Sequence, residues 1–331
     1  MTIQKGIWHL YCASMWLGLW LFGLGTLLCC LMHWWPGDRF LPVRLTNYLM
    51  PWLLVGLLPG LIAAALSHHN WLVMTLGISI IFICSSYAPL FCPARPISST
   101  NEVPLKIMSY NVWRSNEHMN DAAEVIRREQ PDILLLQELK PERAQILTKA
   151  LVNLYPDAEL QFAYEEKRLQ AIISRFPLIC MEKIHNKGRA QKVLIETPKG
   201  PIIVYNIHPP KGRWLRRHRQ LSALLTEDII TSDSPVILGG DFNTNDQSAT
   251  YRLLSQHLHN SHWEAGWGFG FTYPSASFRL RGKFQVPPLV RIDHIFYNDH
   301  FYIKNAGTLT ESGGSDHLPV VAELILNACR S

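Results

Sequence analysis

The chain is organised around the stretch VILGGDFN, residues 236–243. Its first three residues are apolar and mostly β-branched, which predicts a buried strand. Two glycines follow, and we expect the backbone to turn sharply there. Alternation along extended backbone predicts that Asp241 and Asn243 project to the same side. A carboxylate at this position can hold a water or a metal ion, and the amide can donate to a phosphate oxygen. An Asx turn at a strand end is the simpler alternative.

Charge divides the chain into two parts. Residues 1–100 hold four Lys or Arg and one acidic residue, whereas residues 101–331 hold 27 Lys or Arg and 25 Asp or Glu. Because the second part is nearly neutral, its charge does not require a nucleic-acid partner. Five of the seven cysteines lie before residue 100, and their spacing indicates neither a disulfide framework nor a zinc site.

The N-terminal part contains three long segments without Asp, Glu, Lys or Arg, at about residues 8–31, 49–66 and 71–90. Each is long enough to cross a bilayer as a helix, so we predict a membrane anchor over residues 1–92. Pro51 and Pro59 fall in the second segment, where membrane helices tolerate proline. A buried helical hairpin of a soluble protein is the alternative. The few flanking Lys and Arg residues do not decide which side of the membrane the C-terminal part faces.

A polar linker with prolines, residues 93–103, leads to a predicted domain over residues 104–326. Strand-like and helix-like segments alternate in this domain, which is typical of an α/β fold. Besides the strand from residue 236, we predict strands near residues 105–112, 132–137, 171–174, 192–196, 202–207, 291–296 and 318–325, and helices over residues 119–128, 141–153 and 213–230. The domain is long enough for one sizeable core.

Several polar side chains come directly after predicted strands. They are Asn111, Glu138, His208, Asp241 and Asn243. Asp293 lies inside an apolar strand, where a carboxylate needs a partner, and Asp316 and His317 precede the last strand. Oxygen ligands suit Mg²⁺ or Mn²⁺, and a histidine with a buried carboxylate suits proton transfer or charge stabilisation. Each residue alone is common in loops, but together they predict metal-assisted attack of water on phosphorus.

Seven short motifs in a fixed order carry a family resemblance. They are SYNV (109–112), LLQE (135–138), IISRFPL (172–178), NIH (206–208), GDFN (240–243), RIDHI (291–295) and SDH (315–317). This set resembles the endonuclease/exonuclease/phosphatase superfamily, which implies a DNase-I-like four-layer α/β sandwich. With the apolar leader, the chain resembles membrane-anchored bacterial members, including the vancomycin-resistance-type lipid-pyrophosphate hydrolases. That resemblance implies a multi-pass protein of the bacterial inner membrane.

The resemblance also implies roles for individual residues. Glu138, Asn111 and Asp316 correspond to ligands of a Mg²⁺ or Mn²⁺ ion. Asp241 corresponds to the residue that orients or deprotonates the attacking water, and Asn243 and His208 to phosphate contacts. His317, held by Asp293, corresponds to the essential histidine. Three basic residues are expected to bind the substrate: Arg291, Lys211 and Arg213.

Two further stretches have open interpretations. The basic run over residues 211–219 is either an anion-binding rim or a solvated helix start. The aromatic residues of the stretch 263–273 either form a wall for an acyl chain or a base, or pack in the core. Two positions depart from the family pattern: Trp113 replaces a carboxylate that many nuclease members carry, and Gln170 stands near an expected phosphate contact.

These observations predict a membrane-anchored, divalent-metal-dependent hydrolase of phosphoester or pyrophosphate bonds. An extended linker of about ten residues spans at most about 35 Å, so the active domain would stay near the bilayer and meet lipid-linked substrates at raised effective concentration. The alternatives are a metal-dependent nuclease and a catalytically weak domain that binds lipid or a partner protein.

Overall fold

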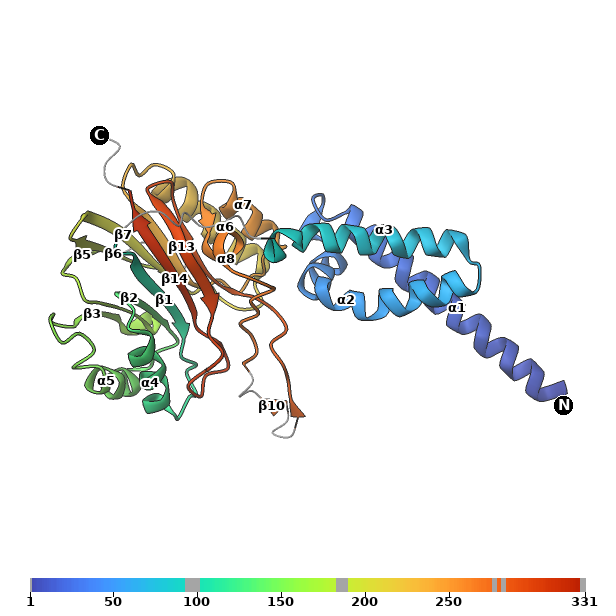
Figure 1. Cartoon of the computed structure of the whole chain (residues 1–331), viewed down its shortest axis with the longest axis horizontal. Helices are drawn as coiled ribbons and strands as arrows, with labels where there is room; N and C mark the ends of the chain where they lie inside the picture. The colour runs from blue at the N-terminus through green and yellow to red at the C-terminus, as the bar shows by residue number, and fades with distance from the viewer. Residues whose placement is uncertain (1, 93–101, 183–189, 276–278, 281–283, 328–331) are drawn as a thin grey trace. The chain divides into compact units, whose positions relative to one another are not determined.

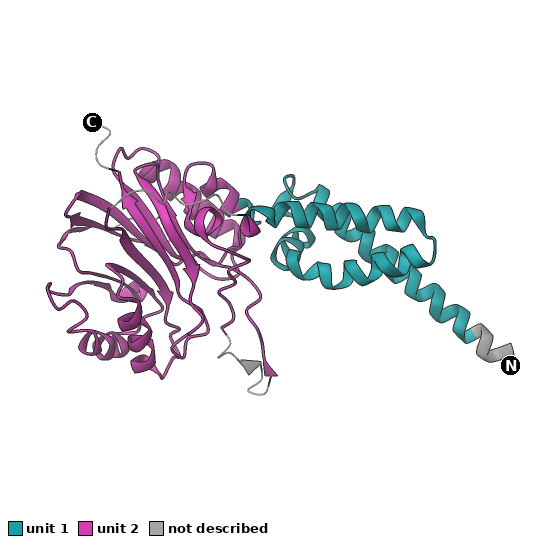
Figure 2. Ribbon diagram, viewed as in Figure 1, with its two compact units in different colours: residues 1–89, 247–249 teal, residues 90–246, 250–331 magenta. Residues whose placement is uncertain are grey.

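The computed structural model describes residues 2–92, 102–182, 190–275, 279–280 and 284–327 (Figure 1). Two compact units make up the chain (Figure 2). The first comprises residues 1–89 with 247–249, and the second comprises residues 90–246 with 250–331. Most of the predicted linker, residues 93–101, lies outside the described residues.

The first unit contains three long helices: α1 (Thr2–Leu31), α2 (Leu41–Leu66) and α3 (Asn70–Tyr87). Short 3₁₀ turns, η1 (Gly37–Arg39) and η2 (Ala88–Phe91), follow α1 and α3. Three segments are long and apolar enough to cross a membrane, namely Ile7–Leu31, Leu41–Leu66 and Asn70–Phe91, with hydropathies of 1.8, 2.1 and 1.8. The three apolar helices are thereby confirmed. The second begins eight residues earlier than predicted, because a proline in its first turn starts the helix at Leu41.

The second unit contains two six-stranded mixed sheets. The first sheet has the order β13 (Phe301–Thr308), β14 (Val320–Leu326), β1 (Leu105–Asn111), β2 (Ile133–Gln137), β4 (Gln170–Ser174), β3 (Gln161–Glu165). The second has the order β5 (Leu178–Glu182), β6 (Ala190–Thr197), β7 (Gly200–Ile207), β8 (Val236–Asp241), β12 (Asp293–Tyr297), β9 (His259–Asn260). A separate short pair, β10 (Arg279–Leu280) and β11 (Phe284–Gln285), lies outside both sheets.

The two sheets pack face to face and are covered by helices on their outer faces (Figure 1). Ile107 and Leu135 of one sheet meet Ile237 of the other in the central core. Helices α4 (Met119–Glu129) and α5 (Pro141–Ala150) cover the first sheet, and α6 (Trp214–Leu224) and α7 (Ala249–Ser255) cover the second. A five-residue helix, α8 (Ser261–Ala265), precedes β12. This arrangement confirms the predicted four-layer α/β sandwich.

Six of the described strands were not predicted. Four are edge strands of the two large sheets, namely β3, β5, β9 and β13, and the other two are the short pair β10 and β11. An edge strand pairs on one side only and is less buried than a central strand, so its sequence need not carry the apolar pattern of a buried strand. β13 shows this directly, because buried and exposed side chains are mixed along it. The helix predicted over residues 213–230 starts at Trp214 and continues as a π-helical turn, η4 (Leu225–Ile229).

Candidate active site

Parallel strand pairs bring the polar residues to one edge of the sandwich. β1 and β2 run parallel with Asn111 opposite Gln137, the residue before Glu138. β7 and β8 run parallel with Ile207 opposite Gly240. The carboxyl ends of each pair therefore lie side by side, and the polar residues that follow them are neighbours.

Two antiparallel strands begin at the same edge. β12 pairs with β8 so that Asp293 lies opposite Asp241. β14 pairs with β1, and the segment before β14 is fixed to the end of β1 because the Ser315 hydroxyl donates to the Asn111 carbonyl at 2.6 Å. The same hydroxyl oxygen accepts the His317 backbone N–H at 3.1 Å. His317 is thereby held beside the carboxyl end of β8.

The two glycines of β8 serve close packing instead of the expected turn, since β8 stays extended through Asp241. A Cβ on Gly239 would lie 2.4 Å from the Leu135 side chain. Gly240 has φ +150°, and a Cβ there would lie 2.0 Å from the Ile207 carbonyl oxygen. Both positions exclude a larger side chain, so β8 can approach β7 and the opposite sheet closely.

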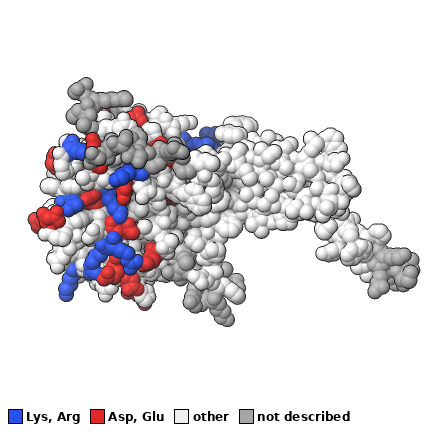
Figure 3. All heavy atoms as spheres, in the orientation of Figure 1, with Lys and Arg blue, Asp and Glu red and all other residues white. Residues whose placement is uncertain are grey.

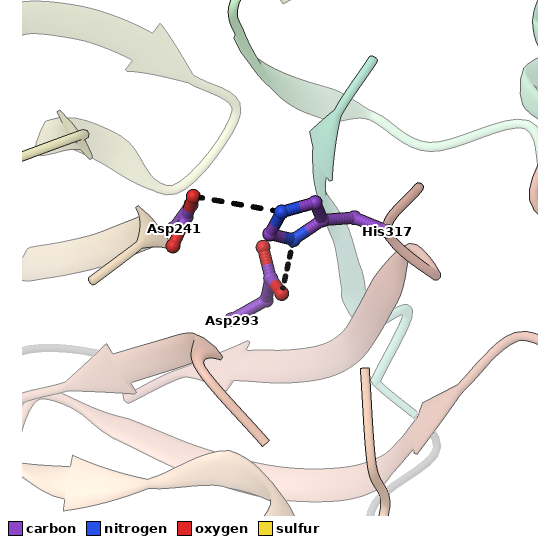
Figure 4. A group of neighbouring side chains, drawn as sticks. All are labelled: Asp241, Asp293 and His317. Atoms are coloured by element: carbon purple, nitrogen blue, oxygen red, sulfur yellow. Dashed lines mark hydrogen bonds and ion pairs between the residues drawn. The ribbon is translucent and has the colours of Figure 1, made fainter. Parts of the chain in front are cut away.

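A histidine and two aspartates form the centre of the site (Figure 4). Nδ1 of His317 lies 2.9 Å from Oδ2 of Asp293, and its Nε2 lies 3.8 Å from Oδ2 of Asp241. All three side chains are buried. Burial alone would lower the pKa of His317, but the carboxylates of Asp293 and Asp241 outweigh it and raise that pKa to about 9. The imidazole is therefore held in its protonated form at neutral pH.

Asp241 is fixed by two amides from different sheets. Asn111 Nδ2 donates to its Oδ2 at 3.0 Å. The backbone N–H of Asn243 donates to its Oδ1 at 2.8 Å, and Asn243 Nδ2 lies 3.3 Å from Oδ2. Asn243 has a left-handed φ of 51°, so it meets Asp241 through an Asx turn and not through the predicted strand alternation. The two predicted side chains are together, but by a different backbone path.

Glu138 lies between a histidine and an arginine. Its Oε1 is 3.5 Å from His208 Nε2, and its Oε2 accepts from the Arg114 backbone N–H at 3.2 Å and from Arg114 Nε at 3.0 Å. Burial would raise the pKa of the Glu138 carboxyl, but these hydrogen bonds outweigh it and lower the pKa. Glu138 also has a left-handed φ of 59°, which is strained for a side chain of this size. A strained, anionic, buried carboxylate at a strand end fits a functional role.

Asp316 and Lys211 complete the charge pattern of the site. Burial raises the pKa of the Asp316 carboxyl, an effect that His317 and Lys211 partly offset. Burial lowers the pKa of Lys211, but Asp241, Glu138 and Asp316 outweigh it and leave that pKa raised. The Lys211 ammonium lies 5.3 Å from the centre of the Tyr273 ring, and that ring lies 4.8 Å from the imidazole of His317. Lys211 is therefore a cation at the site.

The donor set fits a hard divalent cation. Oδ1 of Asp316 is buried and has no hydrogen-bond partner among the described residues. Among the residues that the structure describes, Asn111 Oδ1 accepts only from the Trp113 backbone N–H, which leaves a second lone pair. Together with Glu138 these are oxygen ligands of the kind Mg²⁺ and Mn²⁺ take.

Asp241, Asp293 and His317 also place one ligand atom each within 4.8 Å of one another. In that trio, however, His317 and Asp293 are bonded to each other at 2.9 Å. A metal held by all three would displace the proton between them, so this trio suits proton chemistry better. The oxygen donors Glu138, Asn111 and Asp316 suit a metal.

The three predicted substrate-binding residues lie differently with respect to this cluster. Arg291 is 3% exposed, and its buried charge interacts with Tyr251, Asp246 and, more weakly, Asp293 of the cluster. An interior guanidinium does not suit a direct contact with substrate, and the role of Arg291 in substrate binding stays a prediction. Arg213 is exposed at the N-terminus of α6, and within the described ranges it makes no hydrogen bond or ion pair with the cluster. Lys211, in contrast, faces the cluster, because its charge interacts with Asp241, Glu138 and Asp316.

Residues that sequence reasoning gave no role hold the site together. Gln137 Nε2 donates to Asn206 Oδ1 at 2.8 Å across the two sheets, and Asn206 Nδ2 donates to the carbonyls of Leu136 and Ala171. Gln170, near the expected phosphate contact, is buried and donates to the Asn206 carbonyl. Gln137 and Asn206 lie inside the quoted motifs, and Gln170 lies two residues before one of them. The position of the first two next to predicted site residues is a signal in the sequence.

Comparison with known proteins finds a family match that lies, apart from residues 247–249, within the second unit of the chain. Residues 108–317 match the Endonuclease/Exonuclease/phosphatase family. A protein of this family from Bacteroides thetaiotaomicron has a similar structure, with 18% identity, a TM-score of 0.58, and coverage of 69% of this chain and 100% of that one. A mannosyl-6-phosphatase of the same species has 20% identity, a TM-score of 0.55, and coverage of 67% and 100%.

TDP2 of D. rerio, in complex with a single-stranded DNA product, has 20% identity, a TM-score of 0.54, and coverage of 68% of this chain and 100% of that one. A search of curated proteins found no match. These structural likenesses establish the fold, and the family match covers more than half of the 331 residues. The chain therefore belongs to the endonuclease/exonuclease/phosphatase family.

Proposed function

We propose that the chain is a membrane-anchored hydrolase of phosphoester or pyrophosphate bonds that depends on Mg²⁺ or Mn²⁺ and acts on a lipid-linked substrate. The observation that carries the chemistry is the meeting of Asp241, the His317–Asp293 pair and Glu138 at one edge of the sandwich. Family membership supports a hydrolase. The names of two structural relatives, a mannosyl-6-phosphatase and TDP2 with a DNA product, support a phosphate-containing substrate.

Asp241 is proposed to orient the attacking water and take its proton. Asn111 and Asn243 hold this carboxylate in one orientation, which leaves its Oδ2 3.8 Å from both His208 Nε2 and His317 Nε2. A water bound at Oδ2 would therefore stand beside two imidazole groups that can contact phosphoryl oxygens. Pre-set donors around the reacting group favour the transition state because they need no reorganisation during the reaction.

His317 is proposed to stabilise negative charge on the phosphoryl oxygens. Asp293 keeps its imidazole oriented and protonated, and Nε2, which has no hydrogen-bond partner in the described part of the chain, faces the reacting centre. Asn243 and His208 are proposed phosphate contacts. Glu138, Asn111 and Asp316 would hold Mg²⁺ or Mn²⁺, which when bound supplies a Lewis acid for the phosphoryl oxygens.

Arg114→Ala is expected to tighten Mg²⁺ binding about two- to fivefold. The Arg114 guanidinium lies 3.0 Å from Oε2 of Glu138 and would compete with a metal ion for this oxygen. Because the arginine is half-exposed, the ion pair contributes about 0.5–1 kcal/mol, which the metal would no longer have to displace in the variant. Isothermal titration calorimetry on the full chain in detergent measures the change. Arg128→Ala, which breaks an exposed pair with Glu311, is the matched control and should leave the affinity unchanged. Weaker or unchanged Mg²⁺ binding by Arg114→Ala would contradict the competition.

The surface of the first unit supports membrane anchoring. Leu10, Leu21, Val55 and Ile81 are each more than 60% exposed, and Figure 3 shows almost no charged side chains over these helices. An exposed apolar surface of this kind is compatible with contact with lipid. In a helical hairpin buried in a soluble protein, the same side chains would be covered by other parts of the protein. We propose that the chain is a multi-pass protein of the bacterial inner membrane.

Exposed basic residues support an anionic, lipid-linked substrate. Lys211, Arg213, Arg216 and Arg219, which follow His208 in the chain, are exposed, whereas Arg217 is buried. The basic run is thus mostly accessible, as an anion-binding rim requires. A membrane-tethered site also meets lipid-borne molecules at raised effective concentration.

The substrate class is tested by comparing rates on several substrates under one metal condition. Full chain in detergent is assayed with undecaprenyl pyrophosphate, sphingomyelin, phosphatidylinositol phosphates and supercoiled DNA. We expect one lipid substrate to be hydrolysed fastest. Fastest cleavage of DNA with no turnover of any lipid would favour the nuclease alternative, for which the likeness to TDP2 is the supporting observation. Metal binding without turnover of any substrate would favour a binding domain.

A further inference from the structure

An aromatic cluster lies on the second unit and has no role in the chemistry above. It consists of Phe91, Trp267, Phe269 and Phe271. The Phe91 ring lies edge-on to Trp267 at 5.8 Å and to Phe269 at 5.2 Å, and Phe269 stacks on Phe271 at 5.1 Å. Trp267 is 74% exposed and Phe91 is 43% exposed. Burial of aromatic side chains usually stabilises a fold, and an exposed cluster of them marks a surface that binds another molecule or a membrane.

The cluster is fixed to the end of the third apolar segment. Phe91 is the last residue of Asn70–Phe91, a segment long and apolar enough to cross a membrane. The backbone N–H of Gly268 donates to the Leu90 carbonyl at 2.8 Å. The loop that carries Trp267 and Phe269 is therefore attached at the level where that segment ends.

We propose that the aromatic cluster rests in the headgroup region of the lipid bilayer. Trp rings concentrate at membrane–water interfaces, because their apolar faces enter the acyl boundary while the indole N–H stays hydrated. A cluster that is continuous with the end of a spanning segment lies at that depth once the segment is inserted. The occupant of this surface is thus the bilayer and not a second protein.

The docked cluster brings the bilayer surface close to the catalytic histidine. Tyr273 follows Trp267 by six positions in the chain, and its ring lies 4.8 Å from the imidazole of His317. A chain of six extended residues spans at most about 20 Å. Between them, the Thr272 hydroxyl accepts the backbone N–H of Asp293 at 3.3 Å. A phosphate at headgroup level is then within reach of the site. This consequence rests on the proposed hydrolysis, whereas the docking itself does not.

The test measures the depth of two labelled positions in vesicles. The seven cysteines are replaced, Trp267→Cys is labelled with the environment-sensitive fluorophore NBD, and the full chain is reconstituted into phosphatidylethanolamine–phosphatidylglycerol vesicles that carry a headgroup nitroxide lipid. Tyr302→Cys is the matched control. Tyr302 is 46% exposed, and it lies six residues along β13 from Thr308, whose hydroxyl donates to the Gly270 carbonyl. That separation is about 20 Å.

We expect blue-shifted emission and strong nitroxide quenching at position 267, and water-like, weakly quenched emission at position 302. Water-like emission at both positions would overturn the proposal. So would a blue-shifted label at 267 that the nitroxide does not quench, because protein would then cover the cluster. No catalytic step enters this readout, so loss of the proposed hydrolysis would leave it intact.

A second measurement needs no cysteine replacement. In vesicles with lipids brominated near the headgroups, Trp267→Phe should lower the quenched share of the tryptophan emission. Trp263→Phe is the control, since Trp263 is half-buried and packs against Tyr251 at 6.3 Å. An equal effect of the two variants on the quenched share would contradict the docking.

Discussion

His317→Ala is expected to lower the turnover of a phosphodiester by about 10²–10⁴-fold, the range for a group that transfers a proton or stabilises transition-state charge. The buried imidazole contacts Asp293 at 2.9 Å and presents Nε2 to Asp241 at 3.8 Å. Alanine removes the cation that would face the phosphoryl oxygens. Steady-state hydrolysis of bis-p-nitrophenyl phosphate by the full chain in detergent measures the loss. A turnover near that of the unmodified chain would mean that the site is misplaced.

The pH profile separates the role of Asp293 from that of His317. Asp293 and Asp241 raise the pKa of His317 to about 9. Activity that needs the protonated imidazole should therefore fall as the pH rises through about 9. Asp293→Asn removes one of these anions, and the pKa of His317 should fall toward its ordinary value. The basic limb of the rate profile should therefore move to lower pH. A basic limb at the same pH in both proteins would contradict the assigned pairing.

Glu138→Gln is expected to weaken Mg²⁺ binding strongly and to lower turnover by about a hundredfold or more. Glutamine keeps the shape of the side chain but removes the charge that a hard cation needs. The hydrogen bonds from Arg114 can still form with the amide oxygen, so the fold should survive. Calorimetry gives the metal affinity, and the phosphodiester assay gives the rate.

The matched control for Glu138→Gln is Glu142→Gln. Glu142 is exposed in the first turn of α5, four residues further along the chain. The Glu142→Gln substitution should leave the Mg²⁺ affinity and the turnover unchanged. Normal Mg²⁺ affinity in Glu138→Gln would show that the metal binds elsewhere, for instance at the Asp241, Asp293 and His317 trio.

The buried strands and their polar ends were predictable from sequence because both signals are local. An apolar run that ends in Asp, Glu, Asn or His marks a strand and a side chain at its end, and parallel pairing then places those ends together. β1, β2, β7 and β8 all follow this rule. Asn111 and Asp241 accordingly meet at 3.0 Å, although 130 residues separate them.

Other features depend on tertiary packing that no local pattern contains. Edge strands such as β13 lack an apolar run, so their pairing partner defines them. Arg291 stands in a motif beside Asp293, but burial of its charge in the interior with Asp246 and Asp293 nearby is not visible in that motif. Arg114 reaches Glu138 only because two strand ends adjoin. The aromatic cluster likewise depends on the contact of Phe91 with Trp267, 176 positions further along the chain.

Removal of the metal tests the central claim most directly. Full chain in detergent is treated with EDTA, assayed on bis-p-nitrophenyl phosphate, and assayed again after addition of Mg²⁺ or Mn²⁺. If Glu138, Asn111 and Asp316 hold a metal that the reaction needs, turnover stops in EDTA and returns with the added ion. Turnover that persists in EDTA would contradict metal-dependent hydrolysis at this site.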